Sequence, residues 1–492
     1  MDITVLEQGK RINISGEKNQ TVLKLLQDNH IYIDAPCAGK GTCGKCTVKI
    51  TEGFNESRSL ACLTKAADGM EISVEHSKDI SVLNVSNEER AVVKHGAYGL
   101  AVDIGTTTIA LALADMQSGK IANTYGAINS QRALGADVIS RIKAADEGKL
   151  TLLNDYIIND LRKGIANICI ECELPQEKIQ KIYISGNTTM LHILMNVSCR
   201  SLGQYPFTPE FIELRELPSE EIFGSSPFSC EVSLLPGISA YVGADLAAGV
   251  LHSYSLGGSG KRLLVDLGTN GELALFSEDS VIGTATAAGP AFEGGNISCG
   301  MGSVPGAISK AVFNKETASF TCETIGNTAP AGICGSGLLD IAAELVRFGL
   351  IDEAGVLDDD YFDEGFPVAE GIFLSQKDIR ELQLAKSAVR AGIEILLEEN
   401  NAGCDDIEKI YLAGGFGHTL NLENAVTLGI LPAEWRGKVE SIGNSSLQGC
   451  ICALSSDKDK ERLVSFTKSA KEVNLSAHPK FNELFMEYMM FD

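Results

Sequence analysis

The first part of the chain shows short alternations of apolar and polar residues. ITVL and RINIS alternate as the two strands of a hairpin do, and TVLKLLQDN has the spacing of a short amphipathic helix. CTVKI and MEISVE favour two more short strands. This pattern predicts a small α+β domain over residues 1–78.

The pattern changes after a polar, mixed segment, which we interpret as a linker over residues 79–97. From Tyr98 onward, apolar strands alternate with longer amphipathic helices, which is typical of an α/β architecture. The rest of the chain, residues 98–492, is therefore predicted to be a separate α/β unit.

One pattern occurs twice within this second unit. GLAVDIGTTTIALALAD and LLVDLGTNGELALF each contain an apolar strand, an Asp-x-Gly-Thr turn and a second apolar strand. A single repetition over so long a distance favours a duplicated domain over a solenoid. We expect two similar lobes, roughly residues 98–258 and 259–492.

Composition excludes several classes of protein. The 492 residues carry a net charge of −24, which disfavours nucleic-acid binding because phosphate contacts need clustered Lys and Arg. There is no apolar run long enough to span a membrane and no secretory leader at the start. We therefore expect a cytoplasmic protein with no membrane or nucleic-acid partner.

Four cysteines near the front of the chain suggest a metal centre: Cys37, Cys43, Cys46 and Cys62. The first three lie in a glycine-rich loop, whose amides can donate hydrogen bonds to thiolates and sulfide. The spacing is close to that of plant-type ferredoxins, with one extra residue in the first gap. We favour a 2Fe–2S cluster on a β-grasp ferredoxin-like domain over zinc or structural thiols.

The repeated turns have the composition of phosphate-binding loops. Gly permits close backbone approach, Thr hydroxyls and amides donate to phosphate, and a strand-end Asp can hold Mg²⁺. A third element, KIYLAGGFGHTL, runs from a strand into glycines that would let adenosine lie against the backbone. The expected ATP-binding residues are Asp103, Gly105, Thr106, Thr107 and Thr108 in loop one, Asp266, Gly268, Thr269 and Asn270 in loop two, and Gly414, Gly415 and Phe416 in the adenosine loop.

Three further residues are open to two interpretations each. Lys386 either contacts adenosine or is a solvated helix lysine. Asp245 either orients the attacking water or a metal, or caps a helix. Asn187 belongs either to the site or to a turn.

The three loops together match the signatures of the actin-like ATPase superfamily, which includes acetate and sugar kinases and has a duplicated ribonuclease H-like fold. Combined with the ferredoxin pattern, the chain resembles the reductive activators of corrinoid-dependent enzymes. The resemblance rests on segments such as PCAGKGTCGKC, AVDIGTTT, GNTTMLH, DLGTNGE, GPAFEGGNISCGM, GICGSGLLD and YLAGGFG. It covers nearly the whole chain.

The resemblance implies an ATPase coupled to low-potential electron transfer. Such activators return inactive Co(II) corrinoid on a partner methyltransferase-system protein to Co(I), using ATP and an electron from the cluster. Asp103, Asp266 and Asp245 would then be the catalytic acids, with Mg²⁺ and ATP as cofactors and an upstream electron donor as second partner. Longer members carry an extra domain between the two parts, which this chain lacks.

Two other functions remain open at this stage. One is a redox-regulated small-molecule kinase, although no sugar-binding block is evident. The other is an electron carrier fused to a degenerate ATPase, against which the intact DIGTTT and DLGTN loops argue.

Within the glycine-rich segment from Gly283 to Gly306, Ser298 and Cys299 either approach the corrinoid or belong to a segment lining the nucleotide cleft.

Overall fold

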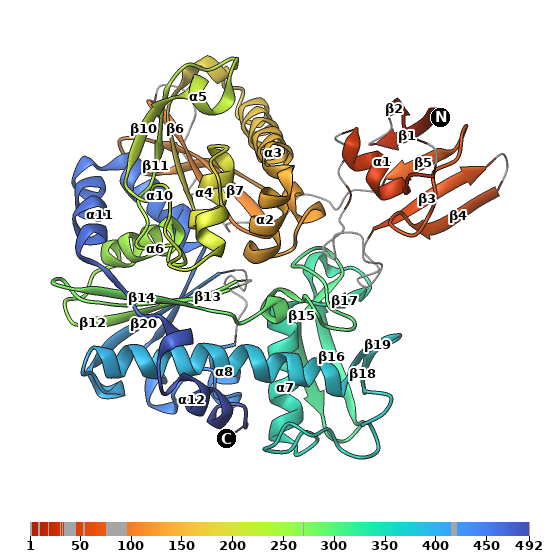
Figure 1. Cartoon of the computed structure of the whole chain (residues 1–492). Helices are drawn as coiled ribbons and strands as arrows, with labels where there is room; N and C mark the ends of the chain where they lie inside the picture. Colours follow the sequence, from red (N-terminus) through yellow and green to blue (C-terminus); the bar gives the residue numbers. More distant parts are fainter. Residues whose placement is uncertain are drawn as a thin grey trace.

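The computed structural model describes residues 2–7, 10–17, 19–29, 31, 33, 46–52, 55–74, 96–268, 270–414 and 421–491. Figure 1 shows a small N-terminal domain beside two larger lobes, one above the other. The order of the parts is the one that the sequence predicts, an α+β domain followed by a two-lobed α/β unit.

The N-terminal domain is one mixed sheet of order β2-β1-β5-β3-β4 with a short helix. Its elements are β1 (Asp2–Glu7), β2 (Lys10–Ser15), α1 (Val22–Asp28), β3 (Thr47–Glu52), β4 (Asn55–Leu60) and β5 (Glu71–Val74). The expected hairpin, helix and strands are confirmed. Strand β4, NESRSL, was missed because an edge strand rich in polar residues lacks the apolar alternation that marks a strand.

The two lobes repeat one strand order. The first sheet, β10-β11-β9-β6-β7-β8, and the second, β21-β20-β12-β13-β14-β22, each place a meander of three strands beside parallel strands that return later in the chain. The first comprises β6 (Tyr98–Ile104), β7 (Thr108–Asp115), β8 (Ile121–Ile128), β9 (Ile179–Gly186), β10 (Arg215–Pro218) and β11 (Glu231–Leu234). The second comprises β12 (Lys261–Leu267), β13 (Gly271–Phe276), β14 (Val281–Thr286), β20 (Ile407–Gly414), β21 (Val439–Gly443) and β22 (Lys471–Glu472). The duplicated fold is thereby confirmed.

Helices cover both sheets. Those that follow strands of the first lobe are α2 (Val138–Ala144), α3 (Leu150–Glu171), α4 (Thr188–Leu194), α5 (Ser219–Phe223) and α6 (Ala244–Ser255). Those of the later chain are α7 (Gly335–Arg347), α8 (Gln376–Glu399), α9 (Leu422–Thr427), α10 (Ser445–Ser455), α11 (Asp457–Ser469) and α12 (Phe481–Glu487). Between β14 and α8 lie the additional strands β15 (Ala307–Asn314), β16 (Ser319–Thr324), β17 (Gly332–Ile333), β18 (Phe366–Ala369) and β19 (Ile372–Leu374).

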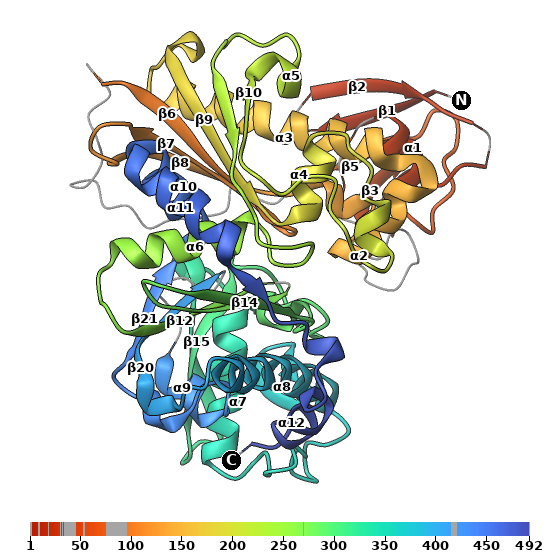
Figure 2. The ribbon, with the colours of Figure 1, turned by 60° about the vertical axis from the view of Figure 1, so that its left-hand side comes forward.

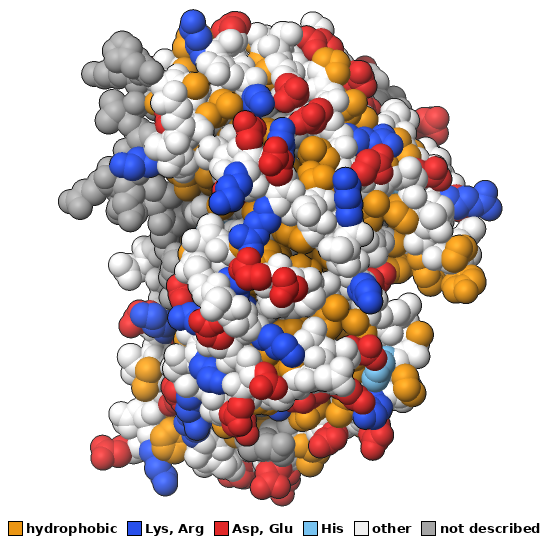
Figure 3. Space-filling model, turned by 90° about the vertical axis from the view of Figure 1, so that its left-hand side faces the viewer, with side chains coloured by type: hydrophobic (Ala, Val, Ile, Leu, Met, Phe, Trp, Pro, Cys, Tyr) orange, Lys and Arg blue, Asp and Glu red, His pale blue; other side chains and the backbone are white. Residues whose placement is uncertain are grey.

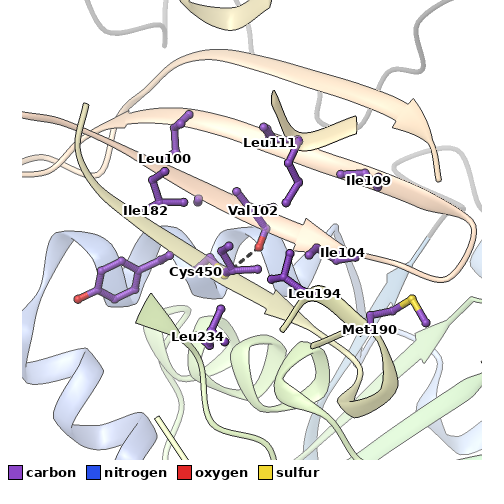
Figure 4. Close-up of a cluster of buried hydrophobic side chains, with 14 of the residues drawn as sticks. Leu100, Val102, Ile104, Ile109, Leu111, Ile182, Met190, Leu194, Leu234 and Cys450 are labelled. Atoms are coloured by element: carbon purple, nitrogen blue, oxygen red, sulfur yellow. Dashed lines mark hydrogen bonds between the residues drawn. The ribbon is translucent and has the colours of Figure 1, made fainter. Parts of the chain in front are cut away.

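Helix α10 joins the lobes. It lies late in the chain, yet its apolar face packs into the core of the first lobe, with Leu447, Cys450 and Leu454 buried there. Figure 4 shows Cys450 among Leu100, Val102 and Ile182, its thiol donating to the Val102 carbonyl at 3.5 Å. Helix α10 also packs along α6, and α6 in turn contacts β12 and β13 of the second sheet, so the two helices connect the halves. The core of the first lobe therefore includes residues beyond the predicted boundary at 258.

The described surface carries charges of both signs. On the face shown in Figure 3, Lys and Arg are interspersed with Asp and Glu. In the part of the chain that the structure describes, no helix combines the length and apolarity needed to cross a bilayer.

Candidate functional site

The two Asp-x-Gly turns occupy corresponding places in the two sheets. Asp103 lies next to the end of β6 and pairs with Ala110 of β7, while Asp266 lies next to the end of β12 and pairs with Glu272 of β13. A Cβ on Gly105 would lie 2.7 Å from the Thr108 carbonyl, so this turn requires glycine. In loop two, the Gly268 amide donates to the Asn270 carbonyl at 3.1 Å, and Thr269 lies outside the described residues.

The first residues of α10 hold both aspartates. Asn444 Nδ2 and Ser446 Oγ donate to the two carboxylate oxygens of Asp103, at 2.9 and 2.8 Å. Ser445 Oγ donates to Asp266 Oδ2 at 3.1 Å. Three consecutive residues of one helix therefore bring the two strand-end carboxylates together between the lobes.

Four carboxyl groups gather at this point, with Glu272 buried and Asp103, Asp245 and Asp266 half-buried. Burial, followed by the charge of Asp103, raises the pKa of Asp266 to about 7. Burial and then Asp103 and Asp266 also raise the pKa of Asp245 to about 7. Burial and then Asp245 raise the pKa of Glu272 well above its usual range. Burial likewise raises the pKa of Asp103, against the hydrogen bonds from α10.

Carboxyl groups so close together repel one another when they are ionised, so a bound cation or a proton must offset this repulsion. Among the described residues, no three or more His, Cys, Asp or Glu side chains converge to form a complete metal site. Mg²⁺ is usually held by one or two carboxylates, with phosphate and water as its other ligands. Asp103 and Asp266 suit that partial ligation, and the chain thus fits a Mg²⁺ that arrives with a nucleotide.

This cluster predicts a pH-dependent stability of the metal-free protein. The folded state holds protons at Asp245 and Asp266 with pKa values of about 7, above the roughly 4 of an unfolded carboxyl. Their contribution to the free energy of unfolding is present below about pH 4 and is lost as the pH rises through about 7. Melting curves without Mg²⁺ should show this loss, and Asp245→Asn should make the decline shallower. A decline as steep as that of the wild type in Asp245→Asn would contradict the assignment.

Hydrogen bonds hold phosphate loop one against the interior of the first lobe. Asn187 Nδ2 donates to Thr106 Oγ1 at 3.1 Å, while its Oδ1 accepts from the Met190 amide at 3.0 Å and caps α4. Asn187 therefore serves the turn and the loop together. Asp245, in the first turn of α6, lies close to Asn187. A Cβ added to Gly243 would lie 2.6 Å from both Asn187 Cα and Asp245 Oδ1.

The glycine-rich segment after β14 contacts loop one across the lobes. Thr107 Oγ1 donates to Glu293 Oε2 at 2.9 Å. Ser298 is held elsewhere, because its amide and hydroxyl donate to Asp378 Oδ1 at 2.7 and 3.0 Å, near the start of α8. Cys299 is half-buried against the core of the second lobe. The contact between Thr107 and Glu293 supports the interpretation that this segment lines the nucleotide region. Ser298 is exposed, and the approach of Ser298 or Cys299 to the corrinoid stays a prediction.

The end of β20 approaches loop two as an adenosine loop should. Gly414 has φ +106°, and a Cβ there would lie 2.3 Å from the Leu267 carbonyl and 2.8 Å from Asp266 Oδ1. Only glycine fits this position. Gly415 and Phe416, the other two expected adenosine residues, lie outside the described residues.

Gly414→Ala is therefore expected to disturb loop two. Gly437 is a matched control, with φ +78° and no atom within 4 Å of an added Cβ. Both substitutions carry backbone strain, and the Gly414 variant adds a clash with the backbone. We expect it to lose about 1–3 kcal/mol more of the free energy of unfolding. Urea denaturation of both variants measures the difference, and equal losses would contradict the close approach.

Lys386 corrects one interpretation. It is 1% exposed, so it is not a solvated helix lysine. Its Nζ donates to the Met490 carbonyl and lies 5.0 Å from the centroid of the Phe491 ring. The chain end folds back over α8, a contact that the local sequence does not reveal. Lys386 thus ties α8 to the C-terminal segment, and the geometry gives no support to an adenosine contact.

Two of the four expected cluster ligands are described. Cys46 and Cys62 are buried, 1% and 8% exposed, in the core of the N-terminal domain. The Ala61 amide donates to the Cys46 carbonyl at 2.8 Å, so the adjacent ends of β3 and β4 bring the backbones of the two cysteines close together. Cys62 is not disulfide-bonded, as thiolate ligation requires. Cys37 and Cys43 lie outside the described residues.

Sequence reasoning missed several residues of this site. Glu272, Glu293 and the triplet Asn444, Ser445 and Ser446 were not singled out. Glu272 is the last residue of the quoted segment DLGTNGE, where it follows Gly271, so the motif itself could have pointed to it. The α10 triplet carries no comparable signal, because only the packing of α10 between the lobes brings it to the aspartates.

Comparison with known proteins agrees with this architecture. Residues 5–67 match the model of a 2Fe–2S iron–sulfur cluster binding domain, residues 98–254 that of the RACo middle region, and residues 261–492 that of the C-terminal ASKHA domain of RACo. The matches support a 2Fe–2S cluster in the first domain and an ATPase of the actin-like class in the rest.

Whole-chain relatives extend the agreement. The corrinoid activation enzyme RamQ of Eubacterium limosum is 30% identical, covering 92% of this chain and 93% of that protein. The [Co(II) methylated amine-specific corrinoid protein] reductase of Methanosarcina barkeri is 26% identical over 79% of this chain and 76% of its own. A solved reductive activator for a corrinoid, iron–sulfur protein superposes with a TM-score of 0.74 at 26% identity, covering 99% of this chain and 98% of that one. The chain belongs to the RACo family of reductive activators of corrinoid proteins.

Proposed function

We propose that this chain uses ATP to return the Co(II) form of a partner corrinoid protein to Co(I), with the electron supplied by its 2Fe–2S cluster. The observation that carries the proposal is the joining, in one chain, of a domain with buried Cys46 and Cys62 to two lobes whose Asp103 and Asp266 meet at α10. The partner would belong to a methyltransferase system. A separate donor would reduce the cluster, and we place the reaction in the cytoplasm.

The energetic reason for coupling the two parts is the low potential of the acceptor. Plant-type clusters lie at about −400 mV, and we expect the Co(II)/Co(I) couple of a corrinoid protein to be lower. Electron transfer then proceeds uphill unless another process favours it. A ligand shifts such an equilibrium only through different affinities for two states. ATP would act by favouring a complex in which the Co(II) state is destabilised.

The residues divide into three roles in this proposal. Asp103 and Asp266 would hold Mg²⁺, and the amides and hydroxyls of Gly105, Thr106, Thr107 and Thr108 in loop one, with Gly268, Thr269 and Asn270 in loop two, would bind phosphate oxygens. Gly414, Gly415 and Phe416 would form the adenosine side. Asp245, whose pKa is raised by burial to about 7, would orient the attacking water. Cys37, Cys43, Cys46 and Cys62 would ligate the cluster, which supplies one electron at a time.

A small-molecule kinase is the other function that the lobes could serve. The two differ in what stimulates ATP turnover. Under our proposal, ATP hydrolysis rises with a corrinoid protein in its Co(II) state and does not rise with the same protein methylated. ATP turnover measured with both forms, and with a panel of small hydroxyl and carboxylate acceptors, decides between them. Phosphorylation of a small acceptor, with no response to Co(II), would exclude the proposal.

A further inference from the structure

The cluster domain contacts the first lobe through a buried glutamine at the end of α1. Gln27 is 9% exposed, and its Nε2 donates to the main-chain carbonyl of Ala133 at 2.9 Å. Tyr156 Oη, from α3, donates to the carbonyl of Gln27 at 3.5 Å. In Figure 2 the cluster domain lies beside the helices of the first lobe. This contact is polar and specific, because the buried side-chain amide of Gln27 donates to the buried carbonyl of Ala133.

The Ala133 carbonyl, which accepts this hydrogen bond, belongs to the last residue of a short 3-10 helix, η1 (Ser130–Ala133). The residue before η1, Asn129, is hydrogen-bonded to phosphate loop one. Asn129 is fully buried and caps η1, with Oδ1 accepting from the Gln131 amide at 3.0 Å. Its Nδ2 donates to the Gly105 carbonyl at 2.8 Å, and its main-chain amide donates to the Thr107 carbonyl at 2.9 Å. One asparagine therefore bonds the phosphate loop and the start of η1 together.

A buried arginine makes the same connection a second time. Arg141 is fully buried, and its guanidinium donates to the Thr106 carbonyl, to Gln131 Oε1 at 3.1 Å and to the Gly135 carbonyl at 3.0 Å. These acceptors lie in loop one, within η1 and just after it. Loop one and η1 are consequently held as one unit.

On the side of the cluster domain, helix α1 is hydrogen-bonded to the turn that contains Cys62. The amides of Val22 and Leu23, at the start of α1, donate to the carbonyls of Thr64 and Ala61, each at 2.9 Å. The turn between those carbonyls contains Cys62. Hydrogen bonds thus link phosphate loop one to η1, η1 to Gln27 of α1, and the start of α1 to Ala61 and Thr64, the residues on either side of the turn with the expected cluster ligand Cys62.

We propose that Gln27 and Asn129 are positioning residues that couple nucleotide binding in phosphate loop one to the docking of the cluster domain. The inference rests on the proposed function, because it requires a nucleotide at this loop. Phosphate oxygens would accept from the loop amides. Each peptide unit whose amide donates becomes a stronger acceptor at its carbonyl, and the carbonyls of this loop are the ones bound by Asn129 and Arg141. Nucleotide therefore tightens η1 and favours the docked cluster domain.

The test is amide hydrogen exchange on the full-length, cluster-loaded protein, with and without a non-hydrolysable ATP analogue and Mg²⁺. In the wild type, the analogue should slow exchange in three places: loop one, η1 and the last turn of α1. The slowing in α1 should be roughly threefold to tenfold, the effect of one hydrogen bond.

Gln27→Glu removes the donor while keeping the shape of the side chain. In this variant the analogue should still slow exchange in loop one and η1, but it should no longer affect α1. Lowering the pH should restore the effect, because a protonated carboxyl can again donate to the Ala133 carbonyl, and a purely structural role would show no such rescue. Lys24→Ala is the matched control, since Lys24 is on the same helix with its side chain 58% exposed in an ion pair with Asp28.

The outcomes separate the two proposals. If α1 of the wild type does not respond while loop one does, the coupling is wrong and the nucleotide site stands. An equal response of α1 in Gln27→Glu and the wild type also overturns the coupling. If loop one itself does not respond, the nucleotide site fails, and this inference fails with it.

Discussion

Asp103→Asn is expected to lower ATP turnover by about 100-fold or more while leaving the 2Fe–2S cluster intact. The substitution keeps the size of the side chain and removes the charge that would help to hold Mg²⁺, the cation that offsets the charge of the phosphates; the loss of one group that stabilises transition-state charge typically costs a factor of about 100 to 1,000. The cluster is unaffected because Asp103 belongs to the first lobe and is held by Asn444 and Ser446. ATP turnover and the visible spectrum of the reconstituted protein measure the two effects.

Asp115→Asn provides the matched control. Asp115 ends β7 of the same hairpin, at the opposite end from the turn, and its side chain binds the Ser118 amide and hydroxyl at 2.8 Å. Its substitution removes a charge from the hairpin without touching the site. ATP turnover near the wild-type rate in Asp103→Asn, or an equal loss in Asp115→Asn, would contradict the role of Asp103.

Cys62→Ser is expected to have the opposite pattern, with the cluster lost and ATP turnover retained. A serine hydroxyl is a poor substitute for a thiolate at iron, and Cys62 is buried in the core of the N-terminal domain. Iron content and the spectrum of the reduced cluster should fall to background. ATP-dependent reduction of a corrinoid should disappear with them, since the chain then has no electron to deliver.

Cys230→Ala tests whether this loss is specific. Cys230 is a free, half-buried thiol beside the edge of the first lobe's sheet, and burial raises its pKa to about 11, so it stays protonated and is a poor metal ligand. It should keep full iron content and full activity. A cluster that persists in Cys62→Ser would show that the fourth ligand is a different cysteine.

The fold was largely predictable from local patterns. Gly105 in the first Asp-x-Gly-Thr turn and Gly414 at the end of β20 are strong signals, because an added Cβ at either one would meet backbone atoms that leave no room for a side chain. The polar strand β4 carries no such signal, since an edge strand needs few apolar residues. Secondary structure was therefore predictable where burial shapes the sequence, and less so where the strand faces solvent.

The site was predictable only in part, because several of its contacts join segments far apart in the chain. Asn444 and Ser446 reach Asp103 through the packing of α10, and Glu293 reaches Thr107 across the lobes. Lys386 shows the reverse case, in which an amphipathic pattern could not reveal that the chain end covers it. Tertiary packing decides these positions, and no local motif encodes it.

The central claim is that ATP lets the cluster reduce a corrinoid that it otherwise leaves oxidised. The most direct measurement mixes the chemically reduced, cluster-loaded protein with a Co(II) corrinoid protein of a methyltransferase system and follows the cobalt absorption, with and without Mg-ATP. The account predicts that Co(I) appears with Mg-ATP and that little appears without it, at no more than one cobalt per reduced cluster. Reduction that proceeds equally without ATP, or that fails with it, would contradict the account.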